Sequence, residues 1–201
     1  MKRLILYITC GLAALCACSQ TVESALAPVI GKLNGGKSVT VQFRTQAGDA
    51  ATAGSLTQMR ECFKMHTPQM SAWYDGRTLW TYNDGARETS VTEPTADELM
   101  EINPFDILNN YQKRFSTRVA HRSAASTTVE FTPKAKGGAI KAAAMTLSNA
   151  TKMPQAIDLT FSNGTKMRIA VTSVTEGKAQ AKGAFTYPAG QYPNVEIIDL
   201  R

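Results

Sequence analysis

Cys62 and His66 come nearest to a metal or nucleophile pair among the residues that follow the first eighteen. Their segment alternates between apolar and polar residues, so on a strand a spacing of four would separate the two side chains by roughly 13 Å. The other histidine, His121, has no cluster of Asp, Glu or Cys around it. We therefore expect no metal site, because metal ligands must converge on one point.

Sequence motifs of catalytic nucleophiles, metalloproteases and nucleotide-binding loops are missing from residues 19–201. This region contains no G-x-S-x-G, H-E-x-x-H, C-x-x-C or phosphate-binding loop. The glycine pair at Gly137 and Gly138 is interpreted as a turn, since short glycine motifs carry little information. The sequence therefore predicts a protein that is not an enzyme and that needs no cofactor.

An acidic group at Asp97, Glu98 and Glu101 could suggest acid–base chemistry, but a structural explanation is stronger. Thr95 and Glu98 have the spacing of a capping box, which marks the first turn of a helix. Carboxylates in a first turn interact favourably with the helix dipole. We interpret the three as helix-stabilising residues.

The composition indicates a globular domain with an export signal. The chain has 201 residues, of which 43% are hydrophobic and 19% charged, as is usual for globular proteins. Lys2 and Arg3 precede an apolar stretch from Leu4 to Cys18, a pattern typical of a secretory signal peptide. We predict a signal peptide over residues 1–18 and one domain over 19–201.

The site at which the leader is cleaved has two interpretations. The run L-C-A-C from Leu15 to Cys18 resembles a lipobox, which would make Cys18 a lipidated residue, although Cys16 is an unusual choice at its position. The alternative is ordinary cleavage near Ala17 or Cys18, which gives a freely diffusing product. Either way Cys62 is the one cysteine of the domain, so no internal disulfide is expected.

The net charge argues against nucleic acid as a partner. The precursor carries +6, and without Lys2 and Arg3 the count is 20 basic against 16 acidic residues. The basic residues are scattered, and no stripe or stacking platform is evident. Weak attraction to anionic lipid is the most that this charge predicts.

Most of the elements predicted for this chain, which must position any site, are strands. A helix is expected over residues 21–33, with Pro28 inside it, and strict alternation follows at Val39, Val41 and Phe43. Asp75-Gly76 lies between two aromatic runs and indicates a hairpin. A two-residue turn would put Trp73, Trp80 and Tyr82 on one face, whereas a three-residue loop would split them.

The centre of the chain is predicted to be helical and its second half to consist of strands. Asn103-Pro104 is a helix start, with Asn103 as the cap. Further strands are expected near 115–122, 126–133, 140–148, 155–162, 165–174 and 180–187. At the Asn163-Gly164 turn the apolar pattern favours Phe161 opposite Met167. About eleven antiparallel strands in total must close or curl to protect their edges.

Methionine and aromatic residues on these strands suit either a packed core or an adaptable apolar cavity. From the residue pattern alone the ordinary core is favoured. The residues concerned are Met59, Met65, Met70, Trp73, Trp80, Tyr82, Met145, Met153 and Met167.

Five stretches together resemble the LolA-type family of outer-membrane lipoprotein carriers, in its Bacteroidetes-like branch. They are F-K-M-x-T-P-x-M at 63–70, W-Y-D-G-R-T-L-W-T-Y-N at 73–83, E-P-T-x-x-E-L at 93–99, I-N-P-F at 102–105 and Y-P-x-x-E-I-I-D-L-R at 192–201. The resemblance implies a mainly β, α+β fold: an unclosed antiparallel barrel of about eleven strands, with an N-terminal helix and a helical lid over an apolar cavity.

The resemblance also implies a function and a set of site residues. It implies a periplasmic carrier that accepts an acylated lipoprotein from an inner-membrane transporter and delivers it to an outer-membrane receptor. The alternative is a receptor tethered through Cys18, or a binder of another hydrophobic ligand. Arg60 is the candidate for holding the lid, although Glu61 follows where the family usually has proline. The candidates for the lipid cavity are Phe63, Met65, Trp73, Trp80, Tyr82, Leu99, Ile102, Phe105 and Leu108.

Overall fold

The computed structural model describes residues 21–201, so the predicted leader and Cys18 lie outside the described residues. Within that range the helices are α1 (Val22–Leu33), α2 (Ala96–Ile102) and α3 (Tyr111–Arg114). Three short 3-10 helices are η1 (Pro104–Leu108), η2 (Lys182–Phe185) and η3 (Ala189–Gln191). None of the helices in this part of the chain combines the length and apolarity needed to cross a membrane.

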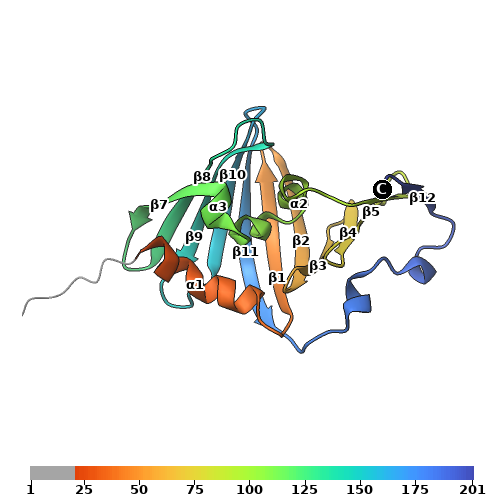
Figure 1. Ribbon diagram of the computed structural model, residues 1–201, viewed down its shortest axis with the longest axis horizontal. Helices are drawn as coiled ribbons and strands as arrows, with labels where there is room; N and C mark the ends of the chain where they lie inside the picture. The colour runs from red at the N-terminus through yellow and green to blue at the C-terminus, as the bar shows by residue number, and fades with distance from the viewer. Residues whose placement is uncertain (1–20) are drawn as a thin grey trace, which may run out of the picture.

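Twelve strands of the described chain form a single sheet (Figure 1). The strands are β1 (Val39–Ala47), β2 (Ala50–Met59), β3 (Cys62–His66), β4 (Met70–Tyr74), β5 (Leu79–Asn83), β6 (Glu88–Thr92), β7 (Phe115–Arg122), β8 (Ser126–Pro133), β9 (Ile140–Ser148), β10 (Pro154–Phe161), β11 (Lys166–Glu176) and β12 (Glu196–Asp199). Their order across the sheet is β12-β6-β5-β4-β3-β2-β1-β11-β10-β9-β8-β7. The predicted unclosed, mainly β fold is confirmed.

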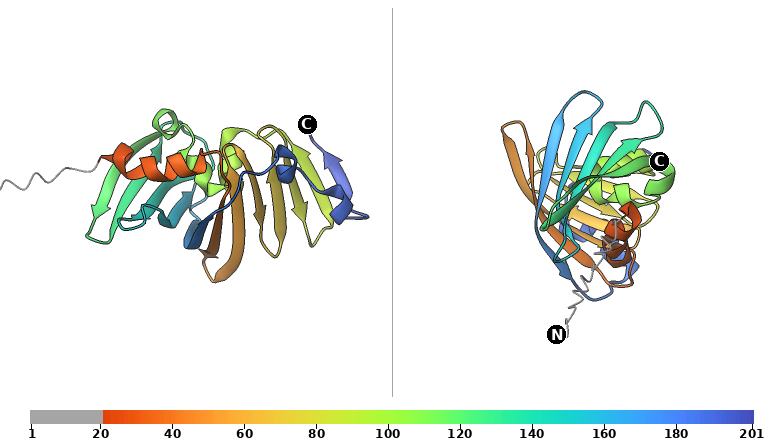
Figure 2. Two further views of the ribbon diagram at one scale, coloured as in Figure 1. Left: turned by 90° about the horizontal axis from the view of Figure 1, so that it is seen from below. Right: turned by 90° about the vertical axis from the view of Figure 1, so that its left-hand side faces the viewer.

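The sheet curls into a half-open barrel with α1, α2 and α3 inside the curve (Figure 2). All neighbouring strands pair antiparallel except β12, which runs parallel to β6. The prediction of a strand at 180–187 is wrong, because this stretch contains η2 and irregular structure. Residues 177–195 instead run from the end of β11 to the far edge of the sheet, where β12 begins (Figure 2).

Local sequence signals explain where the helices begin. The Thr21 side chain accepts a hydrogen bond from the Ser24 amide and starts α1. Thr95 and Glu98 form the predicted capping box of α2. The Asn103 side chain accepts from the Phe105 amide and begins η1, with proline at the first position. Each cap satisfies an amide that the first turn would otherwise leave unpaired.

Two hairpins show how turn length determines register. The loop at Asp75-Gly76 has four residues, and Tyr74 pairs with Leu79, so Trp73 lies opposite Trp80. The Asp75 carboxylate accepts hydrogen bonds from the Arg77 and Thr78 amides and stabilises this loop. The even loop length leaves the three aromatic residues Trp73, Trp80 and Tyr82 on one face.

The register expected at the Asn163-Gly164 turn is wrong by two residues. Leu159 pairs with Met167, and the Phe161 amide donates to the Thr165 carbonyl 2.9 Å away. The turn is tighter than the expected pairing of Phe161 with Met167 requires. A shift of two residues keeps every side chain on its face, so the apolar pattern could not reveal the error.

Candidate lipid-binding site

The concave face of the sheet is an apolar floor. β1, β2, β3 and β5 contribute side chains that are buried on this face, and β8 to β11 continue it. The floor consists of Val39, Val41, Phe43, Leu56, Phe63, Met65, Leu79, Val129, Phe131, Ala143, Met145, Ile157, Leu159 and Ile169. Burial of so much apolar surface on one face is what holds the sheet in its curve.

The lid consists of α2, η1 and α3, and it packs its apolar side onto this floor beside α1. Leu99, Met100, Phe105, Leu108 and Tyr111 of the lid belong to the same buried cluster as the floor. From α1 the cluster contains Ala25, Leu26, Val29 and Leu33. Ile102 is partly buried and packs against it. Lid, α1 and floor thus form one continuous apolar interior.

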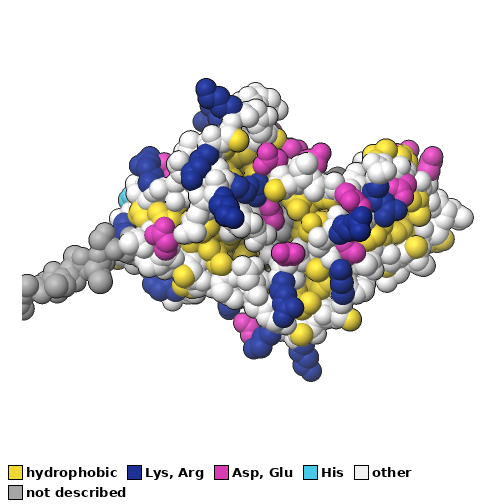
Figure 3. Space-filling model, in the orientation of Figure 1, with side chains coloured by type: hydrophobic (Ala, Val, Ile, Leu, Met, Phe, Trp, Pro, Cys, Tyr) yellow, Lys and Arg dark blue, Asp and Glu magenta, His cyan; other side chains and the backbone are white. Residues whose placement is uncertain are grey.

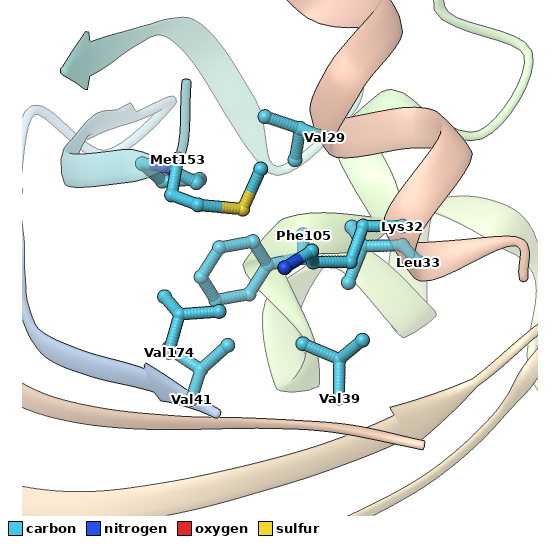
Figure 4. Close-up of a pocket in the computed structure, with 9 residues that line it drawn as sticks. Val29, Lys32, Leu33, Val39, Val41, Phe105, Met153 and Val174 are labelled. Carbon is cyan, nitrogen blue, oxygen red and sulfur yellow. The ribbon is translucent and has the colours of Figure 1, made fainter. Parts of the chain in front are cut away.

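Phe105 fills the space between α1 and the floor (Figure 4). It lies between Val29 of α1 and the β-strand residues Val41 and Val174, with Met153 at its side (Figure 4). The space that remains measures about 10 Å³, which is barely the size of one water molecule. Protein side chains therefore occupy the interior, an arrangement that we call the closed form.

An open groove of about 1440 Å³ runs along the rim of this interior. It lies between α1, the lid and the turns β2–β3 and β4–β5, and Leu99, Leu108, Ile30 and Tyr74 contribute apolar surface to it. Figure 3 shows apolar side chains in the hollow with charged groups of both signs around them. The charged residues of the lining are Glu23, Arg60, Glu61, Asp75, Arg77, Asp106, Arg114 and Lys182.

One buried polar pair joins the lid to the sheet. The Asn103 side-chain amide donates a hydrogen bond to the side-chain oxygen of Gln58, 3.2 Å away, and both residues are almost fully buried. The Gln58 amide group donates in turn to the Arg60 carbonyl. The sequence analysis treated Asn103 only as a helix cap. The available signal for the pair was Gln58, a polar residue on the face of β2 that points into the core.

Arg114 fastens the parts of the lid to one another. Its guanidinium donates to the Asp97 carboxylate and the Ala96 carbonyl, both at 3.0 Å, and to Asp106 at 3.3 Å. Burial raises the pKa of Asp106, and hydrogen bonds from Asn109 and Arg114 offset part of that rise. The sequence analysis did not identify the Asp106–Arg114 pair. The two residues are eight positions apart and no local sequence motif relates them.

Cys62 lies in the groove lining but is a poor nucleophile. Burial is the main cause that raises the pKa of its thiol, and Asp75 and Glu61 raise it further, while Lys182 lowers it. A thiol with a raised pKa stays protonated at neutral pH and reacts slowly. No group of three His, Cys, Asp or Glu side chains within residues 21–201 is arranged to hold a metal ion.

The nominated cavity residues divide between the two faces of the sheet. Phe63 and Met65 face the concave side, together with the lid residues Leu99, Ile102, Phe105 and Leu108. Trp73, Trp80 and Tyr82 pair in register with Lys64, Val91 and Ser71, which alternate with the concave-facing residues and therefore face outward.

The C-terminal segment, residues 177–195, covers two of the outward aromatic residues, Trp73 and Tyr82. Tyr187 and Tyr192 pack against Trp73 with ring centroids 5.4 and 5.6 Å apart, and Tyr192 also contacts Tyr82 at 4.6 Å. Phe185, which is fully buried, packs beneath the Lys64 ammonium group. A second, smaller cluster thus exists on the outer face, separate from the lid.

Arg60 contacts the end of α1 through its backbone. It has a positive φ of 56° in the β2–β3 turn, and its amide donates to the Leu33 carbonyl at the end of α1, 3.0 Å away. Its guanidinium makes no hydrogen bond or ion pair with any other residue between 21 and 201. The structure thus places Arg60 next to α1 rather than next to the lid helices.

Comparison with known families identifies the chain. The family model described as outer membrane lipoprotein carrier protein LolA matches residues 14–164. The chain belongs to this LolA family. Its resemblance in the aromatic hairpin and the N-P-F segment is thereby confirmed. A search of curated protein sequences finds no significant match.

Solved structures align with most of this chain at low sequence identity. An uncharacterized conserved protein from Thermus thermophilus aligns over 88% of this chain and 98% of its own, at 8% identity and a TM-score of 0.59. A putative outer membrane lipoprotein-sorting protein domain from Vibrio parahaemolyticus covers 81% and 94%, at 8% identity and a TM-score of 0.49. The LolA superfamily protein NE2245 from Nitrosomonas europaea covers 84% and 99%, at 11% identity and a TM-score of 0.47.

Proposed function

We propose that this protein is a periplasmic carrier that encloses the acyl chains of lipoproteins between its sheet and its lid, and that it is not an enzyme. The observation that carries the proposal is the continuous apolar cluster shared by the concave floor and the lid. Membership in the LolA family supports the same ligand class. The proposed cargo is an acylated lipoprotein taken from an inner-membrane transporter and passed to a receptor on the outer membrane.

The physical problem that such a carrier solves is large. Each exposed CH₂ costs about 0.8 kcal/mol, so three long acyl chains in water cost on the order of 30–40 kcal/mol. A lid that already packs on an apolar floor exchanges one apolar contact for another when lipid enters. The two states can then lie close in free energy, which allows both capture and release.

In the proposed open state, acyl chains take the place that the lid side chains hold in the closed form. The groove is the natural point of access, since it lies between α1 and the lid and is lined in part by Leu99 and Leu108. The acyl chains would then contact Phe63, Met65, Leu99, Ile102, Phe105 and Leu108. Trp73 and Tyr82 would instead anchor the C-terminal segment, and Trp80 would stay on the outer face.

A reversible lock on the lid tests the proposal. Gln58→Cys and Asn103→Cys, in a Cys62→Ser background, would place two thiols where the buried amide pair now joins sheet and lid. Dansyl-undecanoic acid serves as the probe, because its emission rises in apolar surroundings. We expect uptake by the reduced protein and little or none by the oxidised protein.

The reduced form of the same polypeptide is the control for folding and for the substitutions themselves. Circular dichroism must show equal folding in both forms, and mass spectrometry must show that the disulfide has formed. Equal uptake by the oxidised and reduced forms would mean that the probe binds outside the lid, and the carrier proposal would fail.

The run L-C-A-C at 15–18 supports a second candidate, a receptor that is tethered to a membrane through a lipidated Cys18. A shuttle must diffuse between membranes, whereas a receptor can stay attached to one. Intact mass spectrometry of the protein made in its own cells distinguishes them. A mass that includes acyl groups on Cys18 would favour the receptor, and an unmodified mature mass would favour the shuttle.

A further inference from the structure

The two edges of the sheet differ in how they are protected against pairing with another chain. At one edge, β7 has a bulge between Val119 and His121 and carries the exposed charged residues Arg118 and Arg122. Bulges and charges are the usual means by which an edge strand is kept from adding a further strand. The β7 edge is therefore blocked.

The other edge, formed by β12, has no bulge, and its charged residues, Glu196 and Asp199, are acidic rather than basic. Its sequence from Glu196 to Asp199 contains no lysine, proline or bulge. Ile197, Ile198 and Leu200 are 55%, 36% and 64% exposed, and within residues 21–201 they are the exposed large hydrophobic side chains. An exposed apolar edge is a template for strand addition.

The backbone of β12 has unpaired groups that point away from the sheet. The Glu196 amide donates to the Arg87 carbonyl and the Leu200 amide to the Val91 carbonyl, so the even-numbered residues face β6. Backbone direction alternates along a strand. The N–H and C=O groups of Ile197 and Asp199 therefore point outward, where a further strand would accept and donate hydrogen bonds.

The edge is held firmly in place. Arg87 donates a hydrogen bond to the Pro193 carbonyl just before β12. Tyr187 and Tyr192 fix the preceding segment on the outer face of the sheet. A held strand loses less conformational entropy when it binds, which favours a built interaction surface over a frayed end.

We propose that β12 is a docking edge for an extended segment of a partner protein, which adds to the sheet as a further strand. This proposal does not depend on lipid binding. The charges indicate the chemistry of the segment: Glu196 lies directly across from Glu88, and neither carboxylate has an ion-pair partner among the described residues. The matching segment alternates apolar residues with a lysine or arginine that reaches this acidic pair.

A second copy of this chain fits the edge poorly. Self-pairing through the outward groups of Ile197 and Asp199 places a carboxylate opposite an isoleucine or opposite another carboxylate in each antiparallel register. Four residues also bury far less than the roughly 1,600 Å² of a standard stable interface. A short partner segment that binds transiently avoids the unfavourable self-pairing and needs only a small interface.

A synthetic peptide tests the docking edge with the full mature protein. The probe is a nine-residue peptide, capped at both ends, in which valine alternates with lysine and threonine. We expect saturable changes in the amide resonances of residues 196–201 of the isotope-labelled protein. A matched peptide, N-methylated along one edge, cannot form the ladder and should leave these resonances unchanged.

Substitutions provide the matched control. Ile197→Lys with Leu200→Lys should weaken peptide binding by about tenfold, because each introduces a charge on the free edge. Ser116→Lys on the β7 edge should have no effect. Equal binding of the methylated peptide, shifts located in the groove, or a dimer in sedimentation that Ile197→Lys abolishes would each overturn the proposal.

Discussion

Asn103 in the lid and Gln58 in the floor form a hydrogen bond of 3.2 Å inside the apolar interior, 45 positions apart in the chain. It is the buried side-chain link between the moving and the fixed part of the proposed carrier. In apolar surroundings such a pair is strong when complete, and each partner is costly to leave alone. The stability of the closed form should therefore respond to it.

Gln58→Met should loosen the lid. The substitution keeps the volume but leaves the Asn103 amide without an acceptor, so the free energy of unfolding should fall by about 1–3 kcal/mol. Probe uptake should become faster, because the closed form is the state that loses the bond. Urea unfolding and stopped-flow fluorescence measure the two effects.

Thr57→Val is the matched control for that change. Thr57 lies next to Gln58 in β2 but faces outward, where its hydroxyl bonds to the Thr40 hydroxyl at 2.9 Å. Its loss should lower stability without changing the uptake rate. If both variants speed uptake equally, general destabilisation rather than the lid pair is responsible.

Phe105→Ala should replace a filled interior with a cavity. Truncation of a buried phenylalanine costs about 3–5 kcal/mol. The space now measuring about 10 Å³ would widen between Val29, Val41 and Val174, so an acyl probe could bind without displacing the ring. We expect tighter binding of dansyl-undecanoic acid and a larger gain in melting temperature with the probe than in the parent.

Trp80→Ala on the outer face is the comparison for the Phe105 variant. It removes a large aromatic side chain from the same sheet but from the side opposite the lid. Tighter probe binding in this variant as well would contradict the assignment of the concave face as the lipid site.

Asp106 should make the stability of the fold depend on pH. Because burial raises its pKa in the folded protein above the ordinary 3.8, the folded state holds this proton more strongly than the unfolded state. The contribution of Asp106 is thus present in full below about pH 4 and is lost as the pH rises through the folded pKa. Asp106→Asn should remove this decline.

Urea unfolding at several pH values between 3 and 8 measures the difference between the parent and the Asp106→Asn variant. Asp97→Asn is the control, since Asp97 also binds Arg114 but is mostly exposed. The lowered pKa values of Glu98, Glu176 and Asp199 act in the opposite direction, with stability lost in acid, and they are common to all three proteins. The prediction would be contradicted if the difference in unfolding free energy between the parent and Asp106→Asn grew as the pH falls.

Gly54 and Gly31 should respond in opposite directions to alanine. A Cβ at Gly54 would lie 2.6 Å from the Phe43 ring and 2.8 Å from the His66 carbonyl, so Gly54→Ala should destabilise by about 1–3 kcal/mol. At Gly31 in α1 nothing lies within 4 Å of a new Cβ, and alanine there should stabilise by about 0.8–1.0 kcal/mol. Thermal unfolding of the two variants measures both effects. A lower melting temperature for Gly31→Ala would contradict the prediction and show that a close contact exists there in solution.

Local signals in the sequence were sufficient for the elements and for the fold class. The Thr95–Glu98 capping box, the Asn103-Pro104 helix start and the alternation at Val39, Val41 and Phe43 all appear in the structure as predicted. Each depends on residues within a few positions of one another. Such interactions act on a short stretch of chain and can be read without its surroundings.

The tertiary structure alone decided which face of each strand meets the lid. A period of two separates Trp73 from Tyr74 but does not say which of them points into the curve, and here the C-terminal segment covers Trp73 while the concave cluster takes Tyr74. The sequence also did not predict three other features: the Gln58–Asn103 hydrogen bond, the Arg114 contacts and the parallel pairing of β12 with β6. All join residues that are brought together only when the sheet curls, so their energies depend on the whole fold rather than on neighbours in sequence.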